Sequence, residues 1–314
     1  MAEKIVKATR ESFGEALCKL AETNDKIVVL DADLAAATKT GVFKKAYPDR
    51  FINCGIAECN MIGIAAGLST CGKIPFAASF AMFSAGRAFE QVRNSVAYPK
   101  LNVKVVGSHA GISVGEDGAT HQCCEDIALM RVIPGMTVIN PCDHYEMVEA
   151  VKAMAEIHGP CYVRLGRLAV ESVTHDIADY KFELGKGIEL KSGNDITIIA
   201  TGLMVQEALK AATKLKEDGI EARVINIHTI KPLDKEIVIK AAKETGKIIV
   251  CEEHNVIGGL GDAIASVLIE NCPVPMKKIG VNDTFGHSGP ALDLLKEFGL
   301  SAENIETTVK EFIK

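Results

Sequence analysis

The sequence alternates short runs rich in β-branched residues with stretches of helical periodicity. Strands are expected at residues 27–30, 51–53, 74–78, 103–107, 137–139 and 162–165, and again at 196–200, 223–227, 248–251 and 276–280. Helices are expected between them, at 9–22, 58–70, 205–217, 235–245 and 261–270. Strands that alternate with helices are typical of α/β folds built on parallel sheets. We therefore expect an α/β protein with mainly parallel sheets.

A polar stretch without clear periodicity, residues 171–194, divides this pattern into two series. A chain of 314 residues is long enough for two domains of ordinary size, each with its own core. We expect one domain at 1–172, a linker at 173–194 and a second domain at 195–314.

Charge and cysteine usage narrow the class of protein. The formal net charge is −6, and no cluster of Lys and Arg is present, which argues against a nucleic-acid surface. The amino terminus is charged and no apolar run is long enough to span a membrane, so a cytoplasmic protein is expected. The ten cysteines include no C-x-x-C pair, which favours buried, reduced thiols over zinc sites or disulfides.

The richest concentration of titratable groups lies in residues 107–122, which read G-S-H-A-G-I-S-V-G-E-D-G-A-T-H-Q. Glycines permit positive φ and close approach to a ligand, while His109 and His121 titrate near neutral pH. The segment follows an expected strand, and α/β folds bind ligands at the carboxyl ends of strands. A ligand-binding loop is expected here, with an ordinary surface loop as the alternative.

Two further features are candidates for a site in the first domain. Glu58 opens an apolar helix, where it is either a helix-start residue favoured by the macrodipole or a buried carboxylate that needs a partner. Residues 76–83 concentrate three phenylalanines, and Phe80 and Phe83 share a face if the segment is helical. They either pack in the core or stack on a flat heterocycle.

A glycine cluster in the second domain lies between an expected strand and helix. Gly258, Gly259 and Gly261 lack the spacing of a full G-x-G-x-x-G, because Ile264 stands where the third glycine belongs. A tight turn is favoured here over a nucleotide site.

Taken together, these residues resemble the carboxyl-terminal half of transketolase, a thiamine-diphosphate enzyme. The most specific match is G-E-D-G-A-T-H-Q at 115–122, with S-H-A-G just before it. The resemblance extends from about Thr9 to the end of the chain. It implies a thiamine-diphosphate pyrimidine-binding domain followed by the Rossmann-like transketolase C-terminal domain.

The resemblance assigns Glu58, Phe80 and Phe83 to the cofactor. The glutamate of the family that matches Glu58 hydrogen-bonds the aminopyrimidine ring and controls proton transfer at the cofactor. Phe80 and Phe83 match the aromatic bed of the pyrimidine, with Phe83 as the preferred stacking ring.

The resemblance also assigns residues to the sugar phosphate. His121 is expected at the reacting carbonyl or hydroxyl, where it is catalytic, and Asp117 is expected to read the configuration of a donor hydroxyl. Arg10 and Arg167 match the family's phosphate-binding arginines, and His109 assists them. Arg164 is expected to be structural.

Two departures from the family pattern are visible. Ala37, with Thr38 beside it, stands where the family often has a phosphate-contacting serine, which leaves the acceptor range open. The G-D-G motif and later Asn that hold the diphosphate through Mg²⁺ are missing, since the one G-D pair is Gly261-Asp262 in the second domain. The resemblance therefore implies a partner, an N-terminal transketolase subunit that holds Mg²⁺ and the diphosphate in an α₂β₂ assembly, without which this chain is inactive.

Other functions remain open from sequence. The β subunit of a 2-oxo-acid dehydrogenase has similar architecture but lacks the D-G-x-T-H-Q run. A 1-deoxyxylulose-5-phosphate synthase has a related run but usually carries Arg at the position of His109. A catalytically silent regulatory subunit is the alternative from a different class, and the presence of Glu58, His109, Asp117 and His121 together argues against it.

Overall fold

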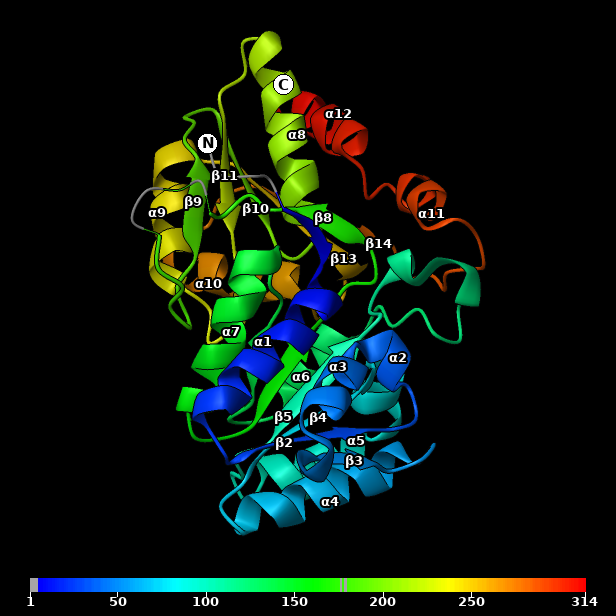
Figure 1. Ribbon diagram of the computed structural model, residues 1–314. Coiled ribbons are helices and arrows are strands. Elements are labelled where there is room, and N and C mark those ends of the chain that lie inside the picture. The colour runs from blue at the N-terminus through cyan, green and yellow to red at the C-terminus, as the bar shows by residue number, and fades with distance from the viewer. Residues whose placement is uncertain (1–4, 176, 178–179) are drawn as a thin grey trace.

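Two sheets, stacked one above the other in Figure 1, organise the molecule. The computed structural model describes residues 5–175, 177 and 180–314. Within these residues, seven strands form the first sheet in the order β12-β6-β7-β5-β4-β2-β3, and five form the second in the order β14-β13-β10-β11-β9. The molecule therefore has two α/β domains, each built on one of these sheets, as the alternating sequence pattern predicts.

The first sheet is parallel except for its β12 edge. Its strands are β2 Ile27–Asp31, β3 Phe51–Asn53, β4 Ile74–Phe80, β5 Lys104–Ser108, β6 Thr137–Ile139, β7 Cys161–Arg164 and β12 Thr229–Lys231. Every residue of β2, β4, β5 and β7 is buried, as expected for a parallel sheet covered on both faces.

Helices cover both faces of the first sheet. On one face, α1, α3 and α7 pack through Phe13, Phe43 and Met147, whereas α4 and α6 pack on the other through Met61 and Ile127. The helices of this region are α1 Thr9–Thr23, α2 Ala35–Thr38, α3 Thr40–Ala46, α4 Glu58–Thr70, α5 Phe89–Gln91, α6 Asp126–Val132 and α7 His144–Glu156. Shorter helical turns are Pro48–Arg50 and Ile112–Asp117, of 3₁₀ type, and Met82–Arg87 and Val92–Ala97, of π type.

The second sheet is covered by α8 and α12 on one face and by α9 and α10 on the other. Its strands are β9 Ile188–Lys191, β10 Ile196–Ala200, β11 Ala222–Asn226, β13 Ile248–Asn255 and β14 Met276–Val281. Its helices are α8 Met204–Glu217, α9 Lys235–Thr245, α10 Leu260–Asn271, α11 Ala291–Glu297 and α12 Ala302–Ile313. One hydrophobic cluster contains residues from helices of both domains, including Ile127 and Ile264, so the two domains share part of their core.

Two strand pairings join segments that the sequence pattern does not predict to be neighbours. Strand β12 follows β11 of the second series but pairs antiparallel with β6 of the first sheet. Strand β1, Val6–Ala8, forms a small antiparallel ribbon with β8, Ala169–Glu171. The polar stretch 171–194, whose sequence has no clear periodicity, contains strand β9 at Ile188–Lys191, which pairs with β11 at the edge of the second sheet.

Candidate active site

The candidate site lies at the carboxyl ends of β4 and β5. These strands are parallel neighbours, and their register pairs Phe80, the last residue of β4, with Ser108, the last residue of β5. The residue after β5 is His109, whose ring stacks on Phe80 with centroids 4.1 Å apart. The sheet itself thus brings together two side chains that lie far apart in sequence.

An aromatic cluster of Phe80, Phe83 and His121 forms around this contact. The two phenylalanine rings are stacked with centroids 6.0 Å apart, and the His121 ring meets Phe83 edge-on at 5.3 Å. Phe80 belongs to strand β4 and Phe83 to the helical turn that follows, so the two share a face without the segment being helical throughout. Phe83 is half-buried, which leaves part of its ring available to a planar ligand.

Glu58 joins this cluster through Arg87. The Glu58 side chain is 2% exposed at the start of α4, and its Oε2 accepts a hydrogen bond from Nη1 of Arg87 over 3.1 Å. The Arg87 guanidinium lies over the Phe83 ring, 4.8 Å from its centroid. A buried carboxylate requires a partner of this kind, and within the described chain the bond reaches Oε2 and leaves Oε1 for a ligand.

The sequence interpretation missed Arg87. Its one sequence signal is the spacing of four residues from Phe83 within a helical stretch, which places the two side chains next to each other.

We call residues 109–122 the site loop. His109 has φ +54°, in the left-handed region that few residues other than glycine adopt, and Gly111, Gly115 and Gly118 also have positive φ. These glycines let the chain turn sharply enough for both ends of the loop, His109 and His121, to reach the aromatic cluster.

His109 is neutral at physiological pH. Burial lowers the pKa of His109 to about 3, and the positive charges of Arg10 and Arg167 add to the effect. Nε2 of His109 lies 3.3 Å from Nη1 of Arg10, and Nδ1 lies 2.9 Å from the Ser108 hydroxyl. Because a guanidinium donates hydrogen bonds, Nε2 is the acceptor and the ring proton resides on Nδ1.

Arg10 and Arg167 form a cationic group beside His109. Burial lowers the pKa of Arg10, and Arg167 lowers it further. Within the described residues the buried Nε of Arg10 has no hydrogen-bond partner, while Nη1 donates to Ala37 O over 2.9 Å. Arg167 donates to Glu116, an exposed carboxylate, over 2.6 Å. Both arginines line a cleft of ≈ 460 Å³ that also borders the start of α11 and includes the carboxylates of Glu116 and Asp293, so the two guanidinium groups are the ones that would bind an anion there.

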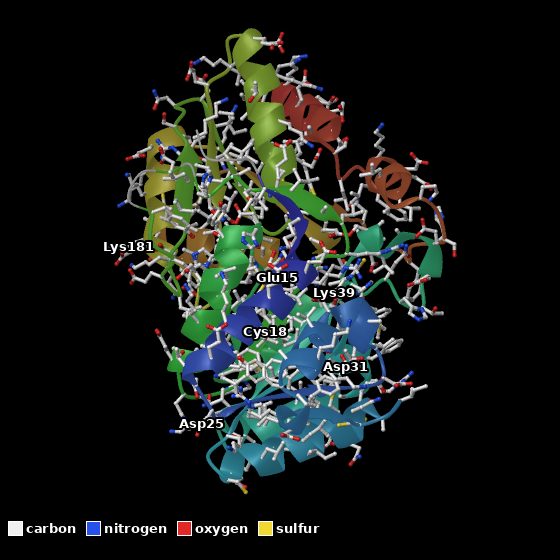
Figure 2. The ribbon with its side chains drawn as sticks, in the orientation of Figure 1. Glu15, Cys18, Asp25, Asp31, Lys39 and Lys181 are labelled. Carbon is white, nitrogen blue, oxygen red and sulfur yellow. The ribbon has the colours of Figure 1, made fainter. Side chains whose placement is uncertain are left out.

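Ala37 and Thr38 differ in what they offer this cleft. The Ala37 carbonyl accepts from Arg10, whereas the buried Thr38 hydroxyl donates to Oδ2 of Asp31 over 2.7 Å. Asp31, labelled in Figure 2, ends β2 and also accepts from the Thr40 hydroxyl. The Thr38 hydroxyl therefore bonds to Asp31 and does not take the place of the serine that the resemblance leads one to expect at position 37.

The two remaining predicted residues lie toward the open side of the loop. Asp117 is exposed at the end of the short turn Ile112–Asp117. His121 is half-buried, and its Nδ1 lies 2.9 Å from the Thr120 hydroxyl. The structure thus brings His121 onto the aromatic cluster and leaves Asp117 at the rim.

Arg164 is a structural residue, as expected. It is 4% exposed, and its Nε donates to Oδ2 of Asp126, which is fully buried, over 2.9 Å. A second carboxylate, Oε2 of Glu253, lies 3.9 Å from Nη1 of Arg164. The guanidinium is thus enclosed by two buried carboxylates and turned away from ligands.

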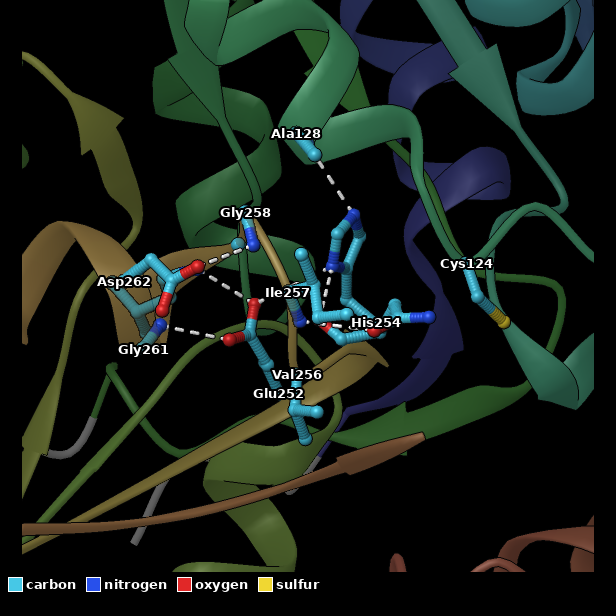
Figure 3. A network of polar contacts seen from close by, with 12 residues as sticks. Cys124, Ala128, Glu252, His254, Val256, Ile257, Gly258, Gly261 and Asp262 are labelled. Carbon is cyan, nitrogen blue, oxygen red and sulfur yellow. Dashed lines mark hydrogen bonds and ion pairs between the residues drawn. The ribbon is translucent and has the colours of Figure 1, made fainter. Parts of the chain in front are cut away.

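The glycine cluster of the second domain forms a tight turn, as predicted. Glu252 accepts hydrogen bonds from the backbone N–H groups of Leu260 and Gly261 over 2.7 and 2.8 Å. Figure 3 shows the bond between Glu252 and Gly261. A phosphate at a helix amino terminus would need these same N–H groups. The carboxylate of the chain itself occupies the anion position, so a nucleotide site here is excluded.

Metal, thiol and membrane features add no further site. Among residues 5–175, 177 and 180–314, no group of three His, Cys, Asp or Glu side chains is placed to hold a metal ion. All ten cysteines are free thiols, of which Cys123, Cys124, Cys142, Cys161 and Cys251 are buried. In the same part of the chain, no helix combines the length and the apolar character needed to cross a bilayer.

The described residues fit part of a thiamine-diphosphate site. The buried Glu58 carboxylate suits a ring nitrogen, and the partly open Phe83 ring suits the face of a pyrimidine. The chain thus offers one end of such a cofactor a binding surface.

Comparison with known proteins agrees with this geometry. Residues 6–172 match the family model described as "Transketolase, pyrimidine binding domain", and residues 185–305 match "Transketolase, C-terminal domain". A protein of Methanocaldococcus jannaschii named as a transketolase C-terminal section is 51% identical over 99% of this chain and 98% of its own length. One of the subunits of the apulose-4-phosphate transketolase of Phocaeicola vulgatus is 41% identical over 100% of both chains. A solved structure described as a split gene transketolase, inactive β4 tetramer, has 52% identity and a TM-score of 0.90, over 97% of this chain and 98% of the other.

Proposed function

The chain belongs to the transketolase family, as the C-terminal section of a split enzyme, and we propose that with its partner subunit it transfers a two-carbon ketol unit between sugar phosphates. The observation that carries the proposal is the placement of Glu58, His109 and His121 around one aromatic cluster. This cluster lies beside the cleft that Arg10 and Arg167 line. A cofactor site and a sugar-phosphate site would then meet at that cluster.

The cofactor-facing half consists of Glu58, Phe83 and Phe80. Bound thiamine diphosphate supplies the carbon nucleophile for ketol transfer. Glu58 would hold the pyrimidine ring by a hydrogen bond, for which its second carboxyl oxygen is not used by Arg87. Phe83 offers its ring face to the pyrimidine, and Phe80 supports it from behind. Arg87 pairs with the buried Glu58 side chain and so provides the partner that a buried carboxylate needs.

The sugar-facing half consists of residues at both ends of the site loop and the arginines. An imidazole N–H of His121 stabilises negative charge that develops on the sugar oxygen, which is its catalytic role. Arg10 and Arg167 bind the phosphate, and the Nε of Arg10, which has no partner in the described part of the chain, is a free donor for it. His109 contributes a neutral ring to the same end, and Asp117 at the rim reads a hydroxyl of the donor.

A partner subunit supplies what this chain lacks. We propose that it carries the Mg²⁺ and diphosphate ligands and forms an α₂β₂ assembly with this chain, across the exposed side of α4. That side presents Asn60, Gly63 and Gly67, small residues that allow close approach of another chain. The related split-gene chain is described as inactive in its β4 form, which supports the need for a partner. The division at 1–172, 173–194 and 195–314 stays a prediction.

The experiment that tests the function is reconstitution. The chain is purified alone and together with a partner that bears the diphosphate-binding domain, and ketol transfer is measured with thiamine diphosphate and Mg²⁺. We expect turnover from the complex and none from either chain by itself. Robust turnover by the single chain contradicts the need for a partner. A panel of donors and acceptors then defines the substrates, because the apulose-4-phosphate in the name of one relative belongs to that relative.

A further inference from the structure

One contact between the second domain and the site loop is made by a buried carboxylate, that of Glu253. Glu253 lies on β13 and is 3% exposed. Its Oε1 accepts a hydrogen bond from the backbone N–H of Ser113 over 2.6 Å, although the two residues lie 140 positions apart. Burial raises the pKa of the Glu253 carboxyl, whereas Arg164 and the bond from Ser113 act to lower it. A carboxylate is a stronger acceptor than a neutral group, so this bond is a firm anchor for a loop.

The loop is shaped to admit this carboxylate. Gly111 has φ +82°, and a Cβ atom at this position would lie 2.4 Å from Oε1 of Glu253. Such a distance is a severe overlap, so the Glu253 carboxylate occupies the space that a side chain at position 111 would fill. A glycine is therefore required both for the backbone angle and for the approach of Glu253.

Arg164 holds Glu253 in place from the other side. Nη2 of Arg164 donates to the Glu253 carbonyl over 2.7 Å, and Nη1 lies 3.9 Å from Oε2 of its side chain. Through its bond to Asp126, the same guanidinium also reaches the start of α6. The anchor is thus part of a buried charge network that links the second domain to both ends of the loop region.

His109 needs such support. A residue other than glycine is strained in the left-handed region, and it keeps that conformation where surrounding contacts fix it. The Glu253 bond fixes the backbone at Ser113, four residues after His109. On the opposite side of the turn, the Gln122 amide donates to Gly115 O and to His287 O, the latter also in the second domain.

We propose that Glu253 is a positioning residue for the reaction, which holds the site loop so that His109, Asp117 and His121 face the sugar phosphate. The proposal rests on the proposed function for its kinetic consequence. Its structural part, the dependence of the loop on Glu253, does not.

The neighbouring residue provides a matched control. Glu252 is 1% exposed on the same strand and also accepts backbone N–H groups, but those of Leu260 and Gly261 at the start of α10 (Figure 3 shows the bond to Gly261). Glu252→Gln and Glu253→Gln therefore each replace one buried carboxyl group of the second domain by an amide, and Glu253 is the one of the pair that contacts the site loop.

The structural part is tested by hydrogen–deuterium exchange on the full chain without its partner. In Glu253→Gln we expect exchange in residues 109–118 to be roughly tenfold faster, since an amide oxygen is a weaker acceptor for the Ser113 N–H than the carboxyl oxygen that it replaces. In Glu252→Gln we expect faster exchange at 258–262 and no change in the loop. Unchanged loop exchange in Glu253→Gln, or equal acceleration in both variants, overturns the proposal.

The kinetic part is tested in the reconstituted complex. We expect Glu253→Gln to raise the KM for the ketose phosphate roughly tenfold, while the affinity for thiamine diphosphate stays within about twofold, because Glu58 and Phe83 lie on other elements. Glu252→Gln should leave that KM unchanged. An unaltered KM in Glu253→Gln overturns the positioning role. Absence of ketol transfer by the unmodified complex refutes the proposed function instead, and the exchange result still decides the role of Glu253 in the loop.

Discussion

The imidazole of His109 lies nearly parallel on the ring of Phe80, with centroids 4.1 Å apart and an angle of 24° between the ring planes. Phe80 is the last residue of β4 and His109 follows β5, so the two rings meet at the carboxyl ends of two neighbouring parallel strands. The same imidazole also meets Arg10 on its other side. His109 therefore contacts both the aromatic cluster and Arg10, which lines the cleft, so a change in its charge would affect both contacts.

Replacing His109 should reduce the acid sensitivity of the fold. Burial lowers the pKa of His109 to about 3 from the 6.5 of a free side chain, so between those values the unfolded chain binds a proton that the folded chain does not. The unfolding free energy should fall as the pH is lowered through this window, by up to about 1.4 kcal/mol per pH unit for one such histidine. His109→Asn, which tolerates positive φ, should show a shallower fall.

Urea unfolding at pH 7, 6 and 5 measures this difference. His158→Asn, at an exposed histidine, is the control and should keep the slope of the unmodified chain. Equal slopes for His109→Asn and the unmodified chain would show that His109 titrates normally in the folded state.

Glu58→Ala should lower kcat of the reconstituted complex by about 10²- to 10⁴-fold, the range for loss of one acid–base group. The control is Glu236→Ala, because Glu236 is also a first-turn glutamate, of α9, but is exposed. If Glu58 served only the helix macrodipole, both variants would lose a little stability and keep their activity. Steady-state kinetics and thermal unfolding of both variants separate these cases.

Ala37→Ser should improve the binding of phosphorylated acceptors. The Ala37 carbonyl already bonds to Arg10, and the neighbouring Thr38 hydroxyl is committed to Asp31. A hydroxyl at position 37 would add a donor beside the cleft, and one such hydrogen bond corresponds to roughly a three- to tenfold lower KM. The comparison is between an aldose phosphate and the same aldose without phosphate. A similar change for both acceptors would place position 37 away from the phosphate.

The strands of both main series were predictable because each is a short β-branched run between helical segments. Strand β12 was not predictable from the sequence. Its three residues follow strands of the second series but pair with β6 of the first sheet, and that pairing depends on how the two domains pack. Strand β9 lies at a sheet edge with half-exposed residues, so its hydrophobic pattern is weak. Short edge strands are defined by tertiary contacts more than by their own composition.

The site shows the same division between local pattern and long-range contact. Glu58, His109 and His121 were proposed from motifs that are contiguous in sequence, and the structure places all three around one cluster. Arg87 and Glu253 were missed. Arg87 lies 29 positions from Glu58 and Glu253 lies 140 positions from Ser113, and no local pattern marks a partner at such a distance.

Arg167 and Arg164 are three positions apart but should respond to substitution in opposite ways. Arg164 is enclosed by Asp126 and Glu253, so Arg164→Ala leaves buried carboxylates without a partner and should cost about 3–5 kcal/mol of folding stability. Arg167 is 35% exposed and bonds to the exposed Glu116, so Arg167→Ala should unfold at nearly the unmodified temperature. Its expected defect is a KM for phosphorylated sugars raised roughly ten- to a hundredfold, with little change for donors that lack phosphate. Thermal unfolding and paired kinetics on the two donor types measure both effects. A large stability loss in Arg167→Ala, or an equal KM defect on both donors, would remove Arg167 from the phosphate site and leave Arg10 as its principal cation.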